Sequence, residues 1–307
     1  MLPLESVPNF SEGRDRATID AIGAALAAHA RLLDVHADPD HNRSVFTLVG
    51  GEEQLLAALV GAVEVARERI DLRRHEGTHP RIGAADVVPI VPIDAGDLER
   101  ARSVAVELGR RIGLLDLPVF LYSPPERGPA HYRRGGTDEL QRRLDAGELA
   151  QDFGPAKLDP AAGGVIVGAR RPLIAFNVNL RGPVAVAQEI AALVRERDGG
   201  YSGVRALGLD LPRAGLVQVS MNIEDWQAAL PHAIVAKIRL EAEARGAEVA
   251  GAELVGLIPA GAAAAAAGAA LGVSGFDESR VLELRLIRQM KEEPFIDHGD
   301  RKQMERR

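Results

Sequence analysis

The chain of 307 residues contains no cysteine, which excludes disulfides, cysteine-ligated zinc, iron–sulfur clusters and thiol nucleophiles. Long hydrophobic runs are also missing, because the longest, residues 261–271, is shorter than the about 20 apolar residues that span a membrane. The first residues lack the basic and then apolar stretch of a secretory signal. These absences predict a cytoplasmic protein with no membrane partner.

An excess of basic residues is lacking as well. The chain has 37 Lys and Arg against 44 Asp and Glu, a net charge of −7, whereas a general nucleic-acid binder needs a basic face for the phosphates. We therefore expect no nucleic-acid partner. The hydrophobic share of 46% and the charged share of 26% are typical of a globular protein, and the length predicts about two domains.

Periodicity and turn residues predict the same order of elements twice along the chain. In the first half we expect a strand at 7–10, a helix at 15–29, strands at 32–37 and 43–49, a helix at 52–70 and a strand at 85–91. A helix at 97–112, a strand at 119–122 and a Pro/Gly/Arg-rich segment at 124–136 extend it. In the second half we expect a strand at 173–180, a helix at 183–197, strands at 204–209 and 215–223, a helix at 231–245 and a strand at 248–257.

This order predicts an α/β (α+β) fold made of two ferredoxin-like βαββαβ subdomains. We place the first subdomain at residues 1–169 and the second at 170–271. Residues 272–307 are expected to form a C-terminal helix and a charged, solvated tail.

Several strands carry polar side chains on one face and apolar side chains on the other. The polar positions are Asp34, His36 and Asp38, then Asn177 and Asn179, then Gln218, Ser220 and Asn222. A solvated sheet face is one interpretation, but short amide, carboxylate and imidazole groups favour fixed hydrogen bonds. We therefore expect the two sheets to face each other across a polar substrate cleft, with the helices outside.

The segment 73–86 holds the densest group of chemically active side chains. Residues 75–79 match the zinc-protease pattern H-E-x-x-H, which needs a helix so that His75 and His79 share one face. Gly77 inside the pattern and Pro80 directly after it disfavour that helix, so we expect no metal site. Two histidines among arginines suit proton transfer beside an anionic substrate, and the alternative is that they only satisfy hydrogen bonds of the loop.

A series of short motifs resembles the formiminotransferase domain family of folate enzymes. In chain order they are VPNFSEG (7–13), LLDV (32–35), NR (42–43), RHEGTHPRIGA (74–84), DFGP (152–155), GARRPLIAFNVNL (168–180), VSMN (219–222) and LVGLIP (254–259). The resemblance runs from about residue 5 to residue 260. It implies transfer of the formimino group of N-formimino-L-glutamate to N5 of tetrahydrofolate, as in histidine breakdown, with tetrahydrofolate as co-substrate and a homodimer as the assembly.

The resemblance also implies site residues. The family's catalytic histidine corresponds to His79, which would act as general base and then as general acid. The folate-contacting positions would be Gly154, Pro155, Ala156, Lys157, Leu158, Asp159, Pro160, Gly163, Gly199, Gly200, Tyr201, Val204, Arg205 and Gly208. From chemistry alone we add Arg81, Arg170 and Arg171 for substrate carboxylates, and Asn177 and Asn179 for hydrogen bonds in the cleft.

The sequence departs from the family pattern at His36, where many relatives carry an acid, and at 199–203, where basic residues often occur. The second departure leaves the affinity for polyglutamylated folate open. No cyclodeaminase domain follows, so we expect that a separate cyclodeaminase acts on the product. Three alternatives stay open: formyl transfer between 5-formyltetrahydrofolate and glutamate, a non-catalytic folate-binding protein, and a zinc hydrolase using His75 and His79.

Overall fold

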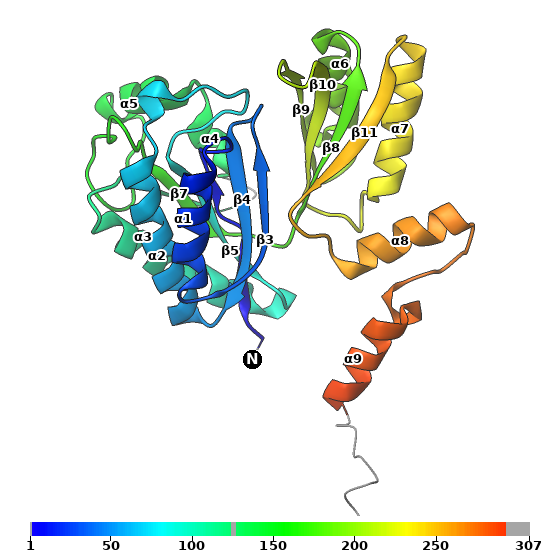
Figure 1. The fold of residues 1–307 in the computed structure, drawn as a ribbon, viewed down its shortest axis with the longest axis horizontal. Helices are drawn as coiled ribbons and strands as arrows, with labels where there is room; N and C mark the ends of the chain where they lie inside the picture. The colour runs from blue at the N-terminus through cyan, green and yellow to red at the C-terminus, as the bar shows by residue number, and fades with distance from the viewer. Residues whose placement is uncertain (1, 124–126, 293–307) are drawn as a thin grey trace, which may run out of the picture.

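The computed structural model describes residues 2–123 and 127–292, which form two β-sheets with helices packed on them (Figure 1). The first part of the chain contributes β1 (Leu4–Ser6), β2 (Asn9–Phe10), α1 (Arg16–Ala27), β3 (Arg31–Asp38), β4 (Arg43–Gly50), α2 (Glu52–Arg69), η1 (Leu72–Arg74), β5 (Ala85–Pro92), η2 (Ala95–Asp97), α3 (Leu98–Gly113), β6 (Val119–Tyr122), α4 (Pro129–Arg133), α5 (Gly136–Asp145) and β7 (Val165–Ala169). The second part contributes β8 (Ile174–Arg181), α6 (Val184–Val194), η3 (Glu196–Asp198), β9 (Val204–Leu211), β10 (Leu216–Ile223), α7 (Pro231–Ala244) and β11 (Glu248–Val255).

Both sheets contain the ferredoxin-like strand order that the sequence predicts. In the first sheet, β1 and β2 are two pieces of one strand between β4 and β5, and β3 lies at the edge beside β4. The second sheet has the order β11-β8-β10-β9, with antiparallel neighbours throughout. The prediction of two βαββαβ subdomains is therefore confirmed.

The first sheet continues beyond this pattern with two parallel strands. β7 lies between β5 and β6 and pairs with both in parallel. β7 is not among the predicted strands, and its five residues are all buried. A strand that is covered on both faces carries apolar residues at consecutive positions, so it lacks the alternation of polar and apolar residues that marks the other strands.

The predicted amphipathic helices cover one face of each sheet. In α1, the side chain of Asp15 accepts a hydrogen bond from the backbone N–H of Ala17 at the N-cap, and Ile19, Ile22 and Leu26 are buried. These side chains share one core with residues of α2, α3 and the first sheet. Helices α6 and α7 cover the second sheet in the same way. Burial of these stripes fixes which face of each sheet stays open.

Helices α4 and α5 differ from the predicted arrangement of helices on the outer faces, because they pack on the opposite face of the first sheet from α3. Tyr132 of α4 and Leu140 of α5 share a small core with Phe120, Val87 and Ile166. The rest of this inner face, over β3, β4 and β2, is turned toward the second sheet (Figure 1). The two short helices therefore cover the part of this face that lies over β5, β6 and β7.

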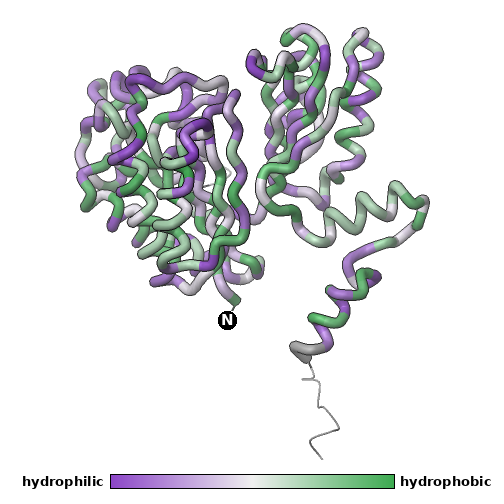
Figure 2. The backbone as a smooth tube through the Cα atoms, viewed as in Figure 1, coloured by the Kyte–Doolittle hydropathy of each residue, from purple (hydrophilic) through white to green (hydrophobic). Residues whose placement is uncertain are grey.

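The last described part of the chain leaves the two sheets. Helix α8 (Ala260–Leu271) begins against the core of the second subdomain through the buried Ala262, and the short η4 (Glu278–Arg280) and α9 (Leu282–Glu292) lie away from both sheets (Figure 1). Figure 2 shows polar and apolar residues alternating along α9. The predicted charged tail from residue 293 onward lies outside the described residues, as do residues 124–126 of the predicted Pro/Gly/Arg-rich segment. Within the described part, none of the helices has the length and hydrophobicity needed to cross a bilayer.

Candidate active site

Arg81 fastens the loop that carries His79 to the turn between β3 and β4. Its Nε and Nη2 donate to the carbonyl oxygen of His79 at 3.1 and 2.8 Å. Nη2 also donates to the carbonyl of His41 at 2.9 Å, and Nη1 to that of Asn42 at 3.0 Å. Burial lowers the pKa of Arg81 to about 10. The sequence predicts that Arg81 binds a substrate carboxylate, whereas its donors in this structure contact the carbonyls of His79, His41 and Asn42 and the ring of His75.

The β3–β4 turn, whose carbonyls accept hydrogen bonds from Arg81, contains a left-handed residue. Asn42 adopts a left-handed φ of 47°, which asparagine tolerates better than most residues. Its side chain accepts from the N–H of Gly13 at 2.9 Å and donates to the carbonyl of Glu76 at 3.0 Å. Asn42 therefore ties together the segment after β2, the turn and the His79 loop.

His79 presents a nitrogen that can accept a proton. Its Nδ1 lies 2.8 Å from the carbonyl oxygen of Pro80. Because a carbonyl only accepts, Nδ1 carries the hydrogen of the neutral ring, and Nε2 is left unprotonated. Burial and the nearby guanidinium groups of Arg43 and Arg133 hold the pKa of His79 well below its usual value. The ring is therefore neutral at neutral pH, and its protonated form readily gives the proton back.

Beside His79 a fully buried carboxylate, Asp86, binds two guanidinium groups. Arg43 Nη1 and Arg133 Nη2 both donate to Asp86 Oδ2, at 2.8 and 2.5 Å, and the N–H of Ile82 donates to Oδ1 at 2.9 Å. Burial alone would raise the pKa of Asp86, but Arg133 and Arg43 outweigh it and the pKa is lowered. Burial, followed by the charge of Arg133, lowers the pKa of Arg43 to about 10.

Arg43, Asp86 and Arg133 are not among the site residues predicted from the sequence. Asp86 did carry a signal, since it is the one charged residue in the otherwise apolar strand β5. Arg43 likewise begins a strand, β4, whose other side chains are largely buried. Arg133 had no such signal, because its position depends on how α4 packs.

The second subdomain contacts the His79 region through a pair of side chains. His41 Nε2 donates to Oε1 of the fully buried Gln218 at 2.9 Å. Nε2 of Gln218 in turn donates to Oδ1 of Asn179 at 2.9 Å. The rings of His41 and His79 have centroids 6.0 Å apart and are tilted by 44°. Asn179, predicted for the cleft, is thus connected to the neighbour of His79.

Asn177 and the unusual His36 lie at a second contact between the subdomains. His36 Nε2 lies 3.3 Å from Glu253 Oε1, and Asn177 Nδ2 donates to Glu253 Oε2 at 3.2 Å. The hydrogen bond between His36 and Glu253 raises the pKa of His36 and lowers that of Glu253. The charge introduced by His36 therefore has a partner within the chain.

Arg170 and Arg171, both predicted to bind substrate carboxylates, lie in different surroundings. Arg170 directly follows β7, where it lowers the pKa of the half-buried Glu5, although desolvation raises that pKa overall. It also lies beside the hydroxyl of Tyr122. Arg171 is exposed, and its carbonyl accepts a hydrogen bond from Arg170 Nη1 at 3.0 Å. Arg170 is thus close to Glu5 and Tyr122, whereas Arg171 faces solvent.

The two predicted folate segments lie in different surroundings. The first, residues 154–163, runs beside residues 82–84, because Ala84 N donates to the carbonyl of Ala162 and Gly83 forms a bridge with Gly163. The second, residues 199–208, packs on α6. A side chain at Gly208 would lie 2.3 Å from the backbone nitrogen of Gln188, so that glycine is required by the contact with the helix. The structure brings only the first segment to the His79 loop.

The zinc pattern lacks the geometry that it needs. Residues 75–79 are not helical, and His75 contacts the carbonyl of Asn42 at 3.1 Å. Burial and the charge of Arg81 lower the pKa of His75. Nowhere among residues 2–123 and 127–292 do three His, Asp or Glu side chains come close enough to hold a metal ion.

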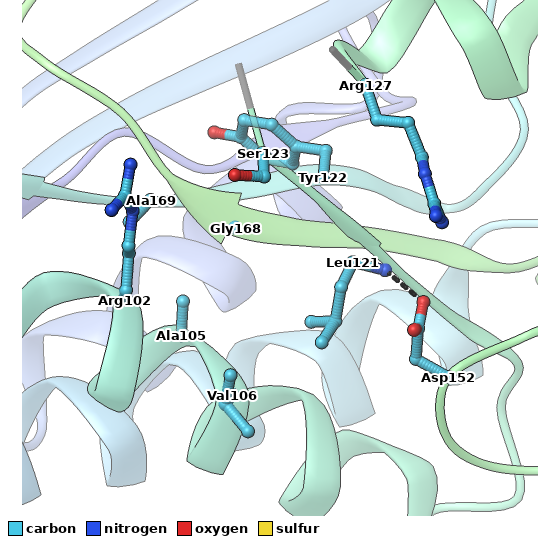
Figure 3. A pocket seen from close by; sticks show the side chains of 10 residues that line it. All are labelled: Arg102, Ala105, Val106, Leu121, Tyr122, Ser123, Arg127, Asp152, Gly168 and Ala169. Atoms are coloured by element: carbon cyan, nitrogen blue, oxygen red, sulfur yellow. Dashed lines mark hydrogen bonds between the residues drawn. The ribbon is translucent and has the colours of Figure 1, made fainter. Parts of the chain in front are cut away.

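Two cavities lie around the first subdomain. One of about 270 Å³ opens where the subdomains meet at the His79 loop, and its lining is Arg14, Asp40, Glu76, Gly77, Thr78, Pro212 and Arg213. The other, of about 410 Å³, lies against α3, on the opposite face of the sheet from α4 (Figure 3). Its lining residues on α3, β6 and β7 include no predicted site residue. The predicted site residues therefore lie away from this second cavity.

Comparison of the sequence with known proteins places this chain in a family. Residues 3–170 match the formiminotransferase domain, N-terminal subdomain, and residues 175–271 match the formiminotransferase domain. A glutamate formimidoyltransferase of Thermoplasma acidophilum is 37% identical over 92% of this chain and 97% of the relative. One of Streptococcus pyogenes is 37% identical over 79% of this chain and 84% of the relative. A formimidoyltransferase-cyclodeaminase of Rattus norvegicus is 36% identical over 78% of this chain and 47% of the relative, so the chain spans about half the length of the rat protein. The chain belongs to the formiminotransferase domain family.

Proposed function

We propose that this chain is a glutamate formimidoyltransferase that uses tetrahydrofolate as co-substrate. In the reaction, N5 of tetrahydrofolate attacks the formimino carbon of N-formimino-L-glutamate, and a new C–N bond forms. The bond between that carbon and the glutamate nitrogen then breaks. The N5 proton must leave and the glutamate nitrogen must gain a proton, so one group that accepts and returns a proton serves both steps.

His79 is the residue we assign to this proton transfer. The observation that carries the assignment is the 2.8 Å contact between Nδ1 and the Pro80 carbonyl, which leaves Nε2 as the acceptor. The lowered pKa favours the neutral ring at the start and makes the protonated ring a good acid for the departing nitrogen. No bond between enzyme and substrate is needed.

We assign the remaining substrate contacts to the inner face. Arg170 and the exposed Arg171 are proposed for substrate carboxylates, and Asn177 and Asn179 for hydrogen bonds to the substrates. Tetrahydrofolate is proposed to contact residues 154–163, whose hydrogen bonds to residues 82–84 support the assignment. For residues 199–208 the support is the family resemblance alone. The Arg81 contacts described above favour a positioning role for that residue.

The wider setting is also part of the proposal. The reaction as written consists of one displacement and two proton transfers, so we propose it without a metal. We further propose a cytoplasmic homodimer that acts in histidine breakdown. We also propose that a cyclodeaminase processes the product, since the rat relative is named for both activities.

The decisive experiment is an assay of purified protein with N-formimino-L-glutamate and tetrahydrofolate, read as methenyltetrahydrofolate absorbance after acid treatment. We expect turnover by the wild type and its loss in His79→Ala. The matched control is His29→Ala, because His29 is exposed after α1 and should be dispensable. 5-Formyltetrahydrofolate with glutamate is tested in parallel. Activity only in that second assay would make the protein a formyltransferase, and no activity in either would leave a folate-binding protein.

A further inference from the structure

Asp40, in the turn between β3 and β4, binds the backbone of the second subdomain. Its Oδ1 accepts a hydrogen bond from the backbone N–H of Arg213 at 2.8 Å. Arg213 lies in the turn between β9 and β10, 173 residues further along the chain. Asp40 is only 8% exposed, and a hydrogen bond to a carboxylate in such surroundings is stronger than one between neutral groups. This contact is separate from the one between His41 and Gln218.

The first subdomain holds Asp40 in place for this contact. Oδ1 of Asp38 accepts from the backbone N–H groups of Asp40 and His41, at 2.7 and 2.8 Å. A side-chain acceptor that binds the backbone two and three residues further on fixes the shape of a turn. The position of Asp40 is therefore set by hydrogen bonds within its own subdomain.

The backbone of the same turn contacts the loop that carries His79. The carbonyl oxygen of Asp40 accepts from the N–H of Thr78, the residue before His79, at 3.3 Å. Gly77 packs so closely on the turn that a Cβ there would lie 2.4 Å from the carbonyl oxygen of His41. Asp40 thus contacts the His79 loop through its carbonyl and the second subdomain through its carboxylate.

The three segments meet around one cavity. Asp40, Thr78 and Arg213 all line the cavity of about 270 Å³ at the His79 loop. Its other lining residues come from the same segments, except Arg14, whose Nε donates to the carbonyl of Pro39 in the β3–β4 turn at 2.8 Å. Because this junction borders a cavity, close packing of side chains contributes little there, and we expect the hydrogen bond of Asp40 to hold it.

We propose that Asp40 is a positioning residue that sets the His79 loop in register with the second subdomain. The inference rests on the proposed function, in which the proton carrier belongs to the first subdomain and Asn177 and Asn179 bind substrate from the second. β10, which follows the Arg213 turn, pairs with β8, the strand that carries both asparagines. Holding that turn against the loop therefore fixes the distance between His79 and these substrate contacts, on which the rate of transfer depends steeply.

The first test compares Asp40→Ala with Asp40→Asn in the transferase assay. Ala removes the acceptor for the Arg213 N–H, whereas Asn retains Oδ1. We expect the kcat of Asp40→Ala to fall about tenfold or more, with each KM within about twofold of the wild type, because the groups that bind substrate remain. Asp40→Asn should recover most of the lost kcat. The pH dependence of kcat/KM should be unchanged in both variants, because burial and the charges of Arg43 and Arg133, which lower the pKa of His79, are not altered.

The second test does not depend on activity. Hydrogen–deuterium exchange at the amides of Arg213 and Thr78 should be faster in Asp40→Ala than in the wild type or in Asp40→Asn. Arg213→Ala keeps the backbone N–H and should leave this protection unchanged. The matched control is Asp94→Ala, which removes an exposed carboxylate that accepts from the N–H of Gly96 at 2.8 Å within its own turn. This control should change neither kcat nor the exchange at Thr78.

Two results would overturn the proposal: exchange at Thr78 that is as slow in Asp40→Ala as in the wild type, or an unchanged kcat in that variant. Failure of Asp40→Asn to recover both properties would overturn it as well, because the charge of Asp40 and not its contact with the backbone N–H would then be required. A wild type without transferase activity whose Thr78 amide still responds to Asp40→Ala would keep the coupling between loop and second subdomain and remove the proposed function.

Discussion

His41 of the first subdomain donates a hydrogen bond to Gln218 of the second, at 2.9 Å between Nε2 and Oε1. Both side chains are buried, and Gln218 also donates to Asn179 at 2.9 Å. The carbonyl of the same His41 accepts from Arg81, which holds the His79 loop. One residue of the β3–β4 turn therefore connects the proposed proton carrier to the opposite sheet.

The first prediction concerns this connection. His41→Phe and Gln218→Met should each lower the free energy of unfolding by about 1–3 kcal/mol, because each leaves a buried polar group without its partner. The double variant should lose less than the sum of the two single losses, since the bond can be broken only once. Urea denaturation of the four proteins gives the coupling energy.

The control for this double-mutant comparison combines His41→Phe with Asp20→Asn. Asp20 forms an exposed ion pair with Arg16 on α1. These two changes should be additive. Equal additivity of the His41 and Gln218 changes would mean that the hydrogen bond between the subdomains does not contribute to stability.

The second prediction is that Asp86→Asn strongly destabilises the protein. Asp86 is fully buried and neutralises part of the charge of Arg43 and Arg133. Removing one partner of a buried ion pair costs about 3–5 kcal/mol, because the remaining charges stay buried. Chemical denaturation should show this loss, whereas Asp20→Asn at the exposed pair should leave the free energy of unfolding nearly unchanged. Similar effects of the two substitutions would contradict the role given to Asp86.

The third prediction is a pH dependence at the contact between His36 and Glu253. The pKa of His36 is raised in the folded chain, so its stabilising contribution is fully present below its ordinary pKa of 6.5 and is lost as the pH rises through the folded value. The pKa of Glu253 is lowered, so its contribution is present above its ordinary value of 4.5 and is lost as the pH falls. The pair stabilises most between these two values.

Melting temperatures of wild type and His36→Gln across this range test the prediction. The difference between the two proteins should be largest near pH 5.5 and should shrink above pH 6.5. The exposed His29, changed to Gln, is the control and should show no such trend. A difference that is constant with pH would mean that His36 is not charged when it contacts Glu253.

The sequence predicted the two subdomains because their helices and strands carry clear periodic patterns. The stripe of Ile19, Ile22 and Leu26 in α1 is an example, and all three side chains are buried as expected. β7 was missed because both of its faces are covered. The polar strand faces also predicted which side of each sheet would be open, and His36 and Gln218 lie at contacts between the subdomains there.

The site could be predicted only in part, because its remaining residues depend on tertiary packing. Arg81 could be recognised as a basic residue near His79, but its acceptors are carbonyls of a turn whose shape depends on the left-handed Asn42. Arg133 belongs to a five-residue helix that packs against β6 through its neighbour Tyr132. The contacts of Arg81 and of Arg133 therefore cannot be predicted from the sequence alone.

The fourth prediction concerns the pH dependence of transfer. The pKa of His79 lies well below its usual 6.5, owing to burial and to the charges of Arg43 and Arg133. Because the neutral ring is the active base, kcat/KM should fall only on the acid side of pH 6.5 and stay level above it. Arg133→Gln removes one of the two charges and should move this acid limb to higher pH, whereas Arg133→Lys keeps the charge and should leave the limb in place. The pH profile of kcat/KM for the three proteins, each checked for native circular dichroism, decides the matter. If the limb does not move in Arg133→Gln, the group that titrates is not His79 beside Arg133, and the assignment of the proton carrier would have to change.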